Sequence, residues 1–180
     1  YNQGGFNLNL GLDPNSENSN LYYDPEFLTN YEIGFNSKIE ELNLNLAAVI
    51  FHSDRKDQQV LISTQVDLND PNTFTFLTQN AAEGTNNGIE LEMDFQLSES
   101  LDMFINFGLL KTEIKSWKSR PEIEGRAQAH APEKSYAIGF NWYPSEQSSF
   151  SLDMVGKSSF YYSDSHDNKS KSYFLTNINY

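Results

Sequence analysis

The 180-residue sequence contains no cysteine, which excludes disulfide-stapled folds, thiolate metal sites and cysteine nucleophiles. Basic residues are also scarce, since 12 Lys and Arg stand against 25 Asp and Glu and give a formal net charge of −13. Binding to nucleic-acid phosphates needs clustered basic side chains, so nucleic acid is excluded as a partner. No apolar run reaches the ~20 residues of a membrane-spanning helix. A membrane-spanning β-strand is not excluded by the low content of apolar residues, because only every second residue of such a strand faces lipid.

Aromatic residues are abundant instead, with 10 Tyr and 13 Phe. This content argues against disorder, because disordered segments are poor in aromatic residues. Patterned sequence reaches both ends of the chain, and no signal peptide is visible within it. We therefore expect a segment of a larger protein, or a mature chain whose leader was removed.

Apolar and polar residues alternate with a period of two, which predicts an all-β fold of about eight strands. The pattern is clearest over residues 89–97, where odd positions are apolar and even positions are polar. It recurs over residues 6–12, 31–35, 42–50, 101–109, 136–142, 150–154 and 174–180. Residues 74–97 contain no turn that would reverse the chain, so we expect one strand much longer than the five or six residues typical of soluble proteins, at roughly twice that or more.

Short and long connections alternate along the chain. The short ones are residues 37–41, 98–100 and 144–147, and the long polar ones are 13–26, 63–73, 116–131 and 163–170. In an antiparallel up-and-down sheet, this order puts all tight turns at one end. Outer-membrane barrels have this organisation, with short periplasmic turns and long external loops.

Aromatic residues cluster near the predicted strand ends. Trp142 and Tyr143 precede a short turn, and residues 160–162 precede a long loop. A strand from Phe150 to Tyr162 would span ~40 Å, or ~30 Å along the membrane normal at a ~40° tilt. This spacing favours two aromatic girdles at the membrane surfaces, and the alternative is a sandwich core or scattered surface rings.

Several motifs, in this order, resemble the later barrel portion of TonB-dependent receptors from Gram-negative outer membranes. The carrying segments are Tyr-Asn-Gln-Gly-Gly-Phe-Asn (1–7), Tyr-Asp-Pro-Glu (23–26), Asn-Tyr-Glu-Ile-Gly-Phe (30–35), Asp-Arg-Lys-Asp-Gln-Gln-Val (54–60), Asn-Ala-Ala (80–82), Gly-Ile-Glu-Leu-Glu (88–92), Ala-Pro (131–132) and Tyr-Ala-Ile-Gly-Phe (136–140). Their order and spacing extend over nearly the whole chain.

The resemblance implies an antiparallel up-and-down transmembrane β-barrel, with this chain forming about eight consecutive strands of a 22-stranded barrel. Residues 1–180 would then be a partial barrel domain without the plug, the earlier strands and the last two strands. The implied function is energy-coupled uptake of a scarce ligand, most often a ferric siderophore. The implied partners are outer-membrane lipid, the receptor's own plug, TonB through the missing N-terminal part, and the iron chelate.

Carboxylates occupy the polar positions of two predicted strands. If Ile89 and Tyr31 face lipid, then Glu90, Glu92 and Glu32 face the lumen. The resemblance implies that these three glutamates contact arginines of the plug, and the alternative is solvated lumen charge. A glycosidase-like acid pair is disfavoured, because no aromatic residues converge beside them to bind a sugar.

One long loop carries candidates for ligand binding. Trp117, Arg120 and Arg126 could stack on or pair with an anionic ferric chelate, or they could be surface decoration. Residues 13–17 and 67–70 have closely spaced oxygen ligands without the full EF-hand pattern, so solvated turns are favoured over calcium sites.

Catalytic and metal-binding motifs are missing from the sequence. His52, His130 and His166 lack ligand spacing, and there is no nucleophile elbow or phosphate-binding loop. We therefore expect no catalytic residue, no metal site and no resident cofactor, and thus no enzyme. Two alternatives to the receptor remain: a complete eight-stranded outer-membrane barrel acting as an anchor or adhesin, and a secreted carbohydrate-binding β-sandwich.

Overall fold

The computed structural model describes residues 1–8, 21–65, 69–70, 72–118, 120–164 and 166–180. Its strands form a two-stranded sheet, β1-β2, and a seven-stranded sheet in the order β3-β4-β5-β6-β7-β8-β9. The strands are β1 (Gly5–Phe6), β2 (Tyr22–Tyr23), β3 (Phe27–Ile39), β4 (Leu44–Gln65), β5 (Phe74–Ser98), β6 (Leu101–Trp117), β7 (Lys134–Ser145), β8 (Ser148–Lys157) and β9 (Tyr173–Asn179). Two short 3₁₀ helices, η2 (Glu40–Leu42) and η3 (Pro121–Ile123), lie in connections.

The chain divides into two compact units. Unit 1 holds Tyr1–Thr29, Ser53–Thr85 and Glu113–Arg126, and unit 2 holds Asn30–His52, Asn86–Thr112 and Ala127–Tyr180. Within the described parts of the chain, no helix is long and apolar enough to cross a membrane.

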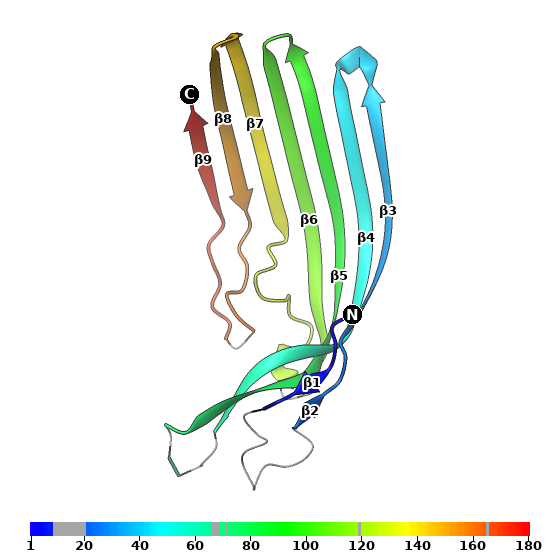
Figure 1. Ribbon diagram of the computed structural model, residues 1–180, viewed down its shortest axis with the longest axis vertical. Helices are drawn as coiled ribbons and strands as arrows, with labels where there is room; N and C mark the ends of the chain where they lie inside the picture. Colours follow the sequence, from blue (N-terminus) through cyan, green and yellow to red (C-terminus); the bar gives the residue numbers. More distant parts are fainter. Residues whose placement is uncertain (9–20, 66–68, 71, 119, 165) are drawn as a thin grey trace. The chain divides into compact units, whose positions relative to one another are not determined.

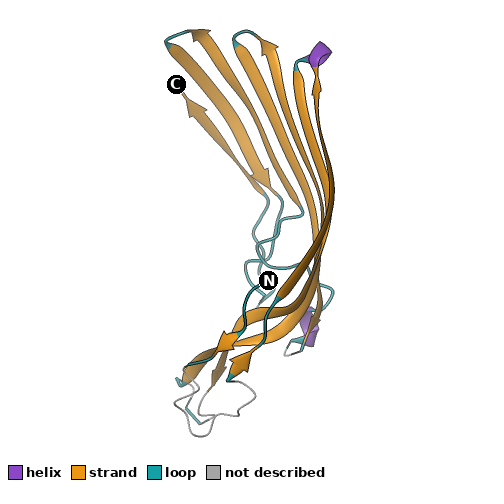
Figure 2. Cartoon of the chain, turned by 45° about the vertical axis from the view of Figure 1, so that its right-hand side comes forward, coloured by secondary structure: helices purple, strands orange, loops and turns teal. Residues whose placement is uncertain are grey.

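The predicted alternation of connections is confirmed. The hairpins β3-β4, β5-β6 and β7-β8 have short turns, whereas the connections after β4, β6 and β8 are long. Figure 1 shows the three short turns together at one end of unit 2, and Figure 2 shows them joining neighbouring strands. Sequential neighbours therefore pair throughout the seven-stranded sheet, as an up-and-down topology requires.

Two strands are unusually long. β5 has 25 residues and β4 has 22, against roughly five or six in an ordinary soluble strand. β5 confirms the prediction of one uninterrupted strand after residue 74. Asp57 within β4 has a left-handed backbone with φ of 53°.

Two strands are shorter in the structure than the sequence predicted. The strand expected over residues 6–12 is limited to Gly5–Phe6 where the structure describes it, because Leu8 lies in a turn, and Leu10 and Leu12 are outside the described residues. β8 ends at Lys157, so no strand runs on to Tyr162. The rings of residues 160–162 belong to a loop, where Tyr161 forms an isolated bridge to Lys169. The membrane height derived from that strand was therefore wrong.

Unit 1 has a small apolar core made of Ala81, Ala82, Ile114, Trp117 and Ile123. Two asparagines tie distant segments to it. Asn7 bonds both backbone groups of Thr78, with Asn7 Nδ2 at 2.8 Å from the carbonyl and Asn7 Oδ1 at 2.7 Å from the N–H.

The second asparagine, Asn80, donates through Nδ2 to the carbonyls of Asp24 and Asp57 at 2.8 and 2.7 Å, and its Oδ1 accepts from the Asp24 N–H. Buried Glu26 completes the set: its Oε1 lies 3.3 Å from Arg55 Nε, and its Oε2 accepts from the Gln59 N–H. The motifs that carry the resemblance therefore hold the first residues of the chain against β4 and β5.

Candidate functional site: the two faces of the unit 2 sheet

The strand register assigns each side chain of β6 to β9 to one of two faces, because directly paired residues point to the same side. Ile105 pairs with Ile138, which pairs with Met154, so these three share a face. Asn106 pairs with Ala137, which pairs with Val155, on the opposite face.

Side-chain contacts extend both faces across β3 to β5. Tyr31 stacks on His52 with ring centroids 6.4 Å apart, and His52 Nδ1 lies 2.7 Å from Asn87 Oδ1. On the other side, Gln128 bonds both Asn86 Oδ1 and Thr112 Oγ1, which joins the even positions of β5 to those of β6.

The first face, here called the apolar face, is hydrophobic and uncovered. It carries Tyr31, Ile33, Phe35, Leu46, Ile50, Ile89, Leu91, Met93, Phe95, Leu97, Leu101, Met103, Ile105, Phe107, Leu109, Tyr136, Ile138, Phe140, Trp142, Phe150, Leu152, Met154, Phe174 and Ile178. Ile33 is 82% exposed and Ile178 is 66% exposed. No residue in the row from Ile89 to Leu97 is buried, so no second layer packs on it, and the sandwich alternative is wrong.

The height of the apolar face fits a bilayer. From Leu101 to Leu109 on β6, eight steps of ~3.3 Å give ~26 Å along the strand, or ~20 Å along the normal at a ~40° tilt. Outer-membrane barrels carry an apolar band of about 25 Å. On β7 the row runs from Tyr136 to Trp142, so exposed aromatic residues lie at both edges, as the girdle prediction requires, although not at residues 160–162.

The edge of the apolar face away from the short turns is sharp. One two-residue step replaces an aliphatic or aromatic side chain by a polar one on four neighbouring strands. This boundary row consists of His52 on β4, Asn87 on β5, Lys111 on β6 and Lys134 on β7, and the ring of Tyr31 on β3 stacks on His52 at its end.

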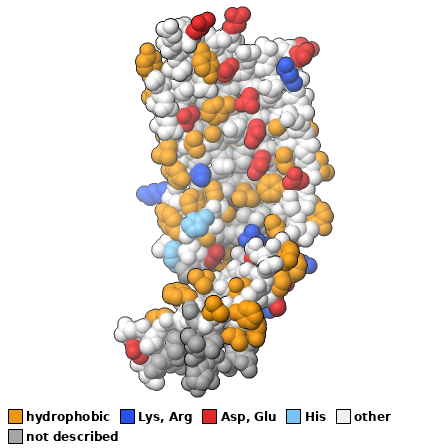
Figure 3. Space-filling view, viewed as in Figure 1, with side chains coloured by type: hydrophobic (Ala, Val, Ile, Leu, Met, Phe, Trp, Pro, Cys, Tyr) orange, Lys and Arg blue, Asp and Glu red, His pale blue; other side chains and the backbone are white. Residues whose placement is uncertain are grey.

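The second face, here called the polar face, is acidic. The predicted residues Glu32, Glu90 and Glu92 all lie on it, so the structure places them on one surface. They share it with Asp94, Asp102 and Asp153, against the two lysines Lys38 and Lys157. Figure 3 shows this excess of acidic side chains over the sheet. Asp102 and Asp153 were not predicted from the sequence as residues of this face, although both stand at polar positions of an alternating strand.

Hydrogen bonds between side chains cross the strands of the polar face. Ser151 Oγ donates to Asn141 Oδ1 at 2.8 Å, and Asn177 Nδ2 donates to Asp153 Oδ2 at 2.8 Å. Within β3 itself, Glu32 Oε2 accepts from Asn30 Nδ2 at 2.9 Å. A face with this chemistry faces water or another protein surface, and not hydrocarbon.

The predicted loop candidates lie in unit 1 and have different surroundings. Trp117 is only 6% exposed and packs in the unit 1 core, which argues against stacking of its ring on a ligand. Arg120 Nε lies 2.9 Å from Glu122 Oε1. The carbonyl of Arg126 accepts from the Ile114 N–H at 2.9 Å, which fixes the backbone of this loop next to β6.

The remaining sequence candidates are the histidines and the two stretches of closely spaced oxygen ligands. No cluster of His, Asp and Glu among the residues that the structure describes could hold a metal ion. His130 has a φ of 58°, and its N–H donates to the Tyr161 carbonyl, so it serves the packing of two loops. The calcium-like residues 13–17, and residues 67 and 68 of the second stretch, lie outside the described residues.

Comparisons with known proteins agree with this architecture. Residues 1–180 match the family described as TonB dependent receptor-like, beta-barrel. The probable TonB-dependent siderophore receptor PiuA of Acinetobacter baumannii is 29% identical over 116 residues, covering 62% of this chain and 14% of that protein.

Solved structures show the same fold. The siderophore receptor PiuA from Acinetobacter baumannii superposes with a TM-score of 0.68 at 20% identity, over 88% of this chain and 22% of that chain. The ferric yersiniabactin uptake receptor FyuA from Yersinia pestis gives 0.67 at 16% identity, over 87% of this chain and 22% of that chain. The chain thus spans about a fifth of these receptors.

The family match over the full chain decides between the receptor and the complete small barrel, in favour of the receptor. Barrels of this family lie in the outer membrane of Gram-negative bacteria. The two-faced sheet is a stretch of their wall, with lipid on its apolar face. This chain belongs to the family of TonB-dependent receptor β-barrels.

Proposed function

We propose that the intact protein imports a ferric siderophore across the outer membrane, using energy delivered through TonB. The observation that carries the proposal is the sheet with an uncovered apolar face and an acidic polar face, in a chain that matches the receptor family throughout. The relatives PiuA and FyuA are named as receptors for iron-chelating ligands. Within the intact receptor, this chain supplies wall strands and part of the ligand-contacting loops.

The proposed receptor has a plug inside a barrel of about 22 strands, and TonB acts on a segment before the plug. Glu32, Glu90 and Glu92 are proposed as contacts for basic residues of that plug. They lie on the polar face, and charge pairs that exclude water are easily loosened because their desolvation offsets much of their attraction. That property suits a plug that has to move.

The plug contacts can be tested in the intact receptor by charge reversal. Glu90→Arg combined with Glu92→Arg should lower transport and loosen the plug, measured as protease sensitivity of the plug. Glu99→Arg in the β5-β6 turn is the control, since it makes the same charge change away from the polar face. Unchanged plug retention and transport in the double variant would count against these contacts.

Arg120 and Arg126 are proposed to pair with an anionic chelate, whereas Trp117 supports the loop from the core. Arginine suits this role because its planar fork pairs with carboxylates or phenolates at two points. The matched variants are Arg120→Gln and Lys118→Gln, both of which remove one positive charge from the same loop. We expect weaker chelate binding by the first variant alone.

The function itself is tested by growth. A strain lacking the intact receptor is starved of iron and given a panel of ferric siderophores, with and without a plasmid copy of the gene. At least one siderophore should support growth only with the plasmid and only with functional TonB. Growth that never depends on the receptor across catecholate, hydroxamate and carboxylate chelates would reject siderophore import.

A further inference from the structure

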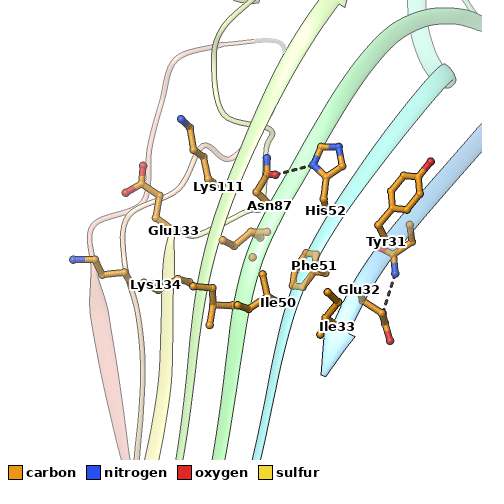
Figure 4. A pocket seen from close by; sticks show the side chains of 15 residues that line it. Tyr31, Glu32, Ile33, Ile50, Phe51, His52, Asn87, Lys111, Glu133 and Lys134 are labelled. Atoms are coloured by element: carbon orange, nitrogen blue, oxygen red, sulfur yellow. Dashed lines mark hydrogen bonds between the residues drawn. The ribbon is translucent and has the colours of Figure 1, made fainter. Parts of the chain in front are cut away.

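An open groove lies along the boundary row of the apolar face. Its walls include the aliphatic residues Ile50, Ile89 and Leu109, and its rim includes Lys111 and Lys134. Figure 4 shows these two lysines with Glu133 toward one end of the row, and Asn87 next to His52 farther along it. The groove has a volume of about 1240 Å³, beyond the roughly 300–1,000 Å³ of pockets that enclose a small molecule.

The two lysines are the groups of this rim that can bind an anion. Both side chains are exposed, and no described residue forms an ion pair or hydrogen bond with either ammonium group. By contrast, His52 and Asn87 bond each other at 2.7 Å. Glu133 and Glu32 also line the groove, but the Glu32 side chain belongs to the polar face and accepts a hydrogen bond from Asn30 there. Lys111 and Lys134 are therefore two cationic groups on the apolar face, in a chain whose formal net charge is −13.

The position of the groove determines what kind of anion can reach it. The short turns lie at the opposite ends of the strands, and short turns of outer-membrane barrels are periplasmic, so the boundary row lies at the outer leaflet. The aliphatic wall continues into the apolar face, where hydrocarbon lies. A soluble anion would leave that wall exposed, whereas a lipid covers it with its acyl chains.

We propose that this groove binds a phosphorylated, multiply acylated lipid of the outer leaflet. Its acyl chains lie against Ile50, Ile89 and Leu109, and its phosphate pairs with Lys111 and Lys134. Lysine near a membrane surface binds anionic headgroups through its charge and keeps its aliphatic stem in the apolar layer. The lipid site rests on the barrel's place in the membrane and is independent of the ligand that the receptor imports.

The test uses the intact receptor in nanodiscs that contain lipid A, either with its phosphates or enzymatically dephosphorylated. Retained lipid A is counted by native mass spectrometry. Each lysine contributes about fivefold to affinity for an anionic surface. The Lys111→Gln and Lys134→Gln double variant should therefore bind phosphorylated lipid with about 25-fold lower affinity. Lys111→Arg with Lys134→Arg should restore binding.

Lys157→Gln is the matched control, because it removes one lysine from the polar face of the same sheet. It should retain phosphorylated lipid A as the unaltered receptor does, and dephosphorylated lipid should bind the unaltered receptor as weakly as phosphorylated lipid binds the double variant. The proposal is overturned if the double variant retains lipid A fully, if Lys157→Gln loses as much, or if removing the phosphates changes nothing. Heat-modifiable gel mobility confirms that each variant is folded.

Discussion

Ile105 offers the sharpest energetic test of the lipid-facing assignment. It lies on the apolar face of β6, four residues from both Leu101 and Leu109, and pairs with Ile138 on β7. Four steps of ~3.3 Å at a ~40° tilt put it about 10 Å from either edge of the apolar band, near the bilayer midplane. Ile105→Arg therefore places a guanidinium in hydrocarbon.

The expected cost follows from that depth. Arginine at the midplane of an outer-membrane barrel costs about 2–4 kcal/mol, which lowers the equilibrium between folded and unfolded receptor about 30- to 700-fold. Asn106→Arg is the control, because the next residue of β6 is exposed on the polar face and needs no hydrocarbon contact. Its cost should stay within about 1 kcal/mol, since exposed substitutions are usually mild.

The assay compares both variants in the intact receptor. The folded fraction in the outer membrane is read from heat-modifiable gel mobility, and stability from the urea midpoint in vesicles. Ile105→Arg should assemble poorly and unfold at lower urea, while Asn106→Arg should resemble the unaltered receptor. Equal costs for the two variants, or a tolerated Ile105→Arg, would refute the assignment of faces.

Two further substitutions test the packing that supports the sheet. Asn80→Leu removes the partner of two Asp24 backbone groups and of the Asp57 carbonyl, so it should cost about 1–3 kcal/mol and increase proteolysis near residue 24; unchanged cleavage would contradict this role. Gly139→Val should reduce folded receptor, because a Cβ there would overlap the Phe104 ring, and normal yields would show that the ring moves freely.

Most of the wall could be predicted because alternation is a local signal. The even and odd positions of residues 89–97 separate cleanly, so the strand and its two faces could be identified without any partner strand. The order of short and long connections then gave the topology. The membership of Glu32, Glu90 and Glu92 on one face followed from the same alternation, while their contact with a plug stays a prediction.

The loops could not be predicted in this way, because long-range contacts decide them. Phe160 and its neighbours suggested a strand end, yet a loop holds them, with the His130 N–H donating to the Tyr161 carbonyl. Trp117 lies in a polar stretch that resembled a surface loop, and its burial depends on Ala81 and Ala82 from another strand. The bonds of Asn7 to Thr78 join residues 71 positions apart, and no local pattern reveals them.

The central claim is that odd residues of the β5 row face lipid and even residues do not. Because the chain contains no cysteine, single cysteines at residues 89–97 can each carry a spin label in the cysteine-free intact receptor in bilayers. Collision with oxygen, which concentrates in hydrocarbon, should be high at 89, 91, 93, 95 and 97 and low between them, with the opposite phase for a water-soluble nickel chelate. Uniform collision rates along the row, or the inverse phase, would contradict the account.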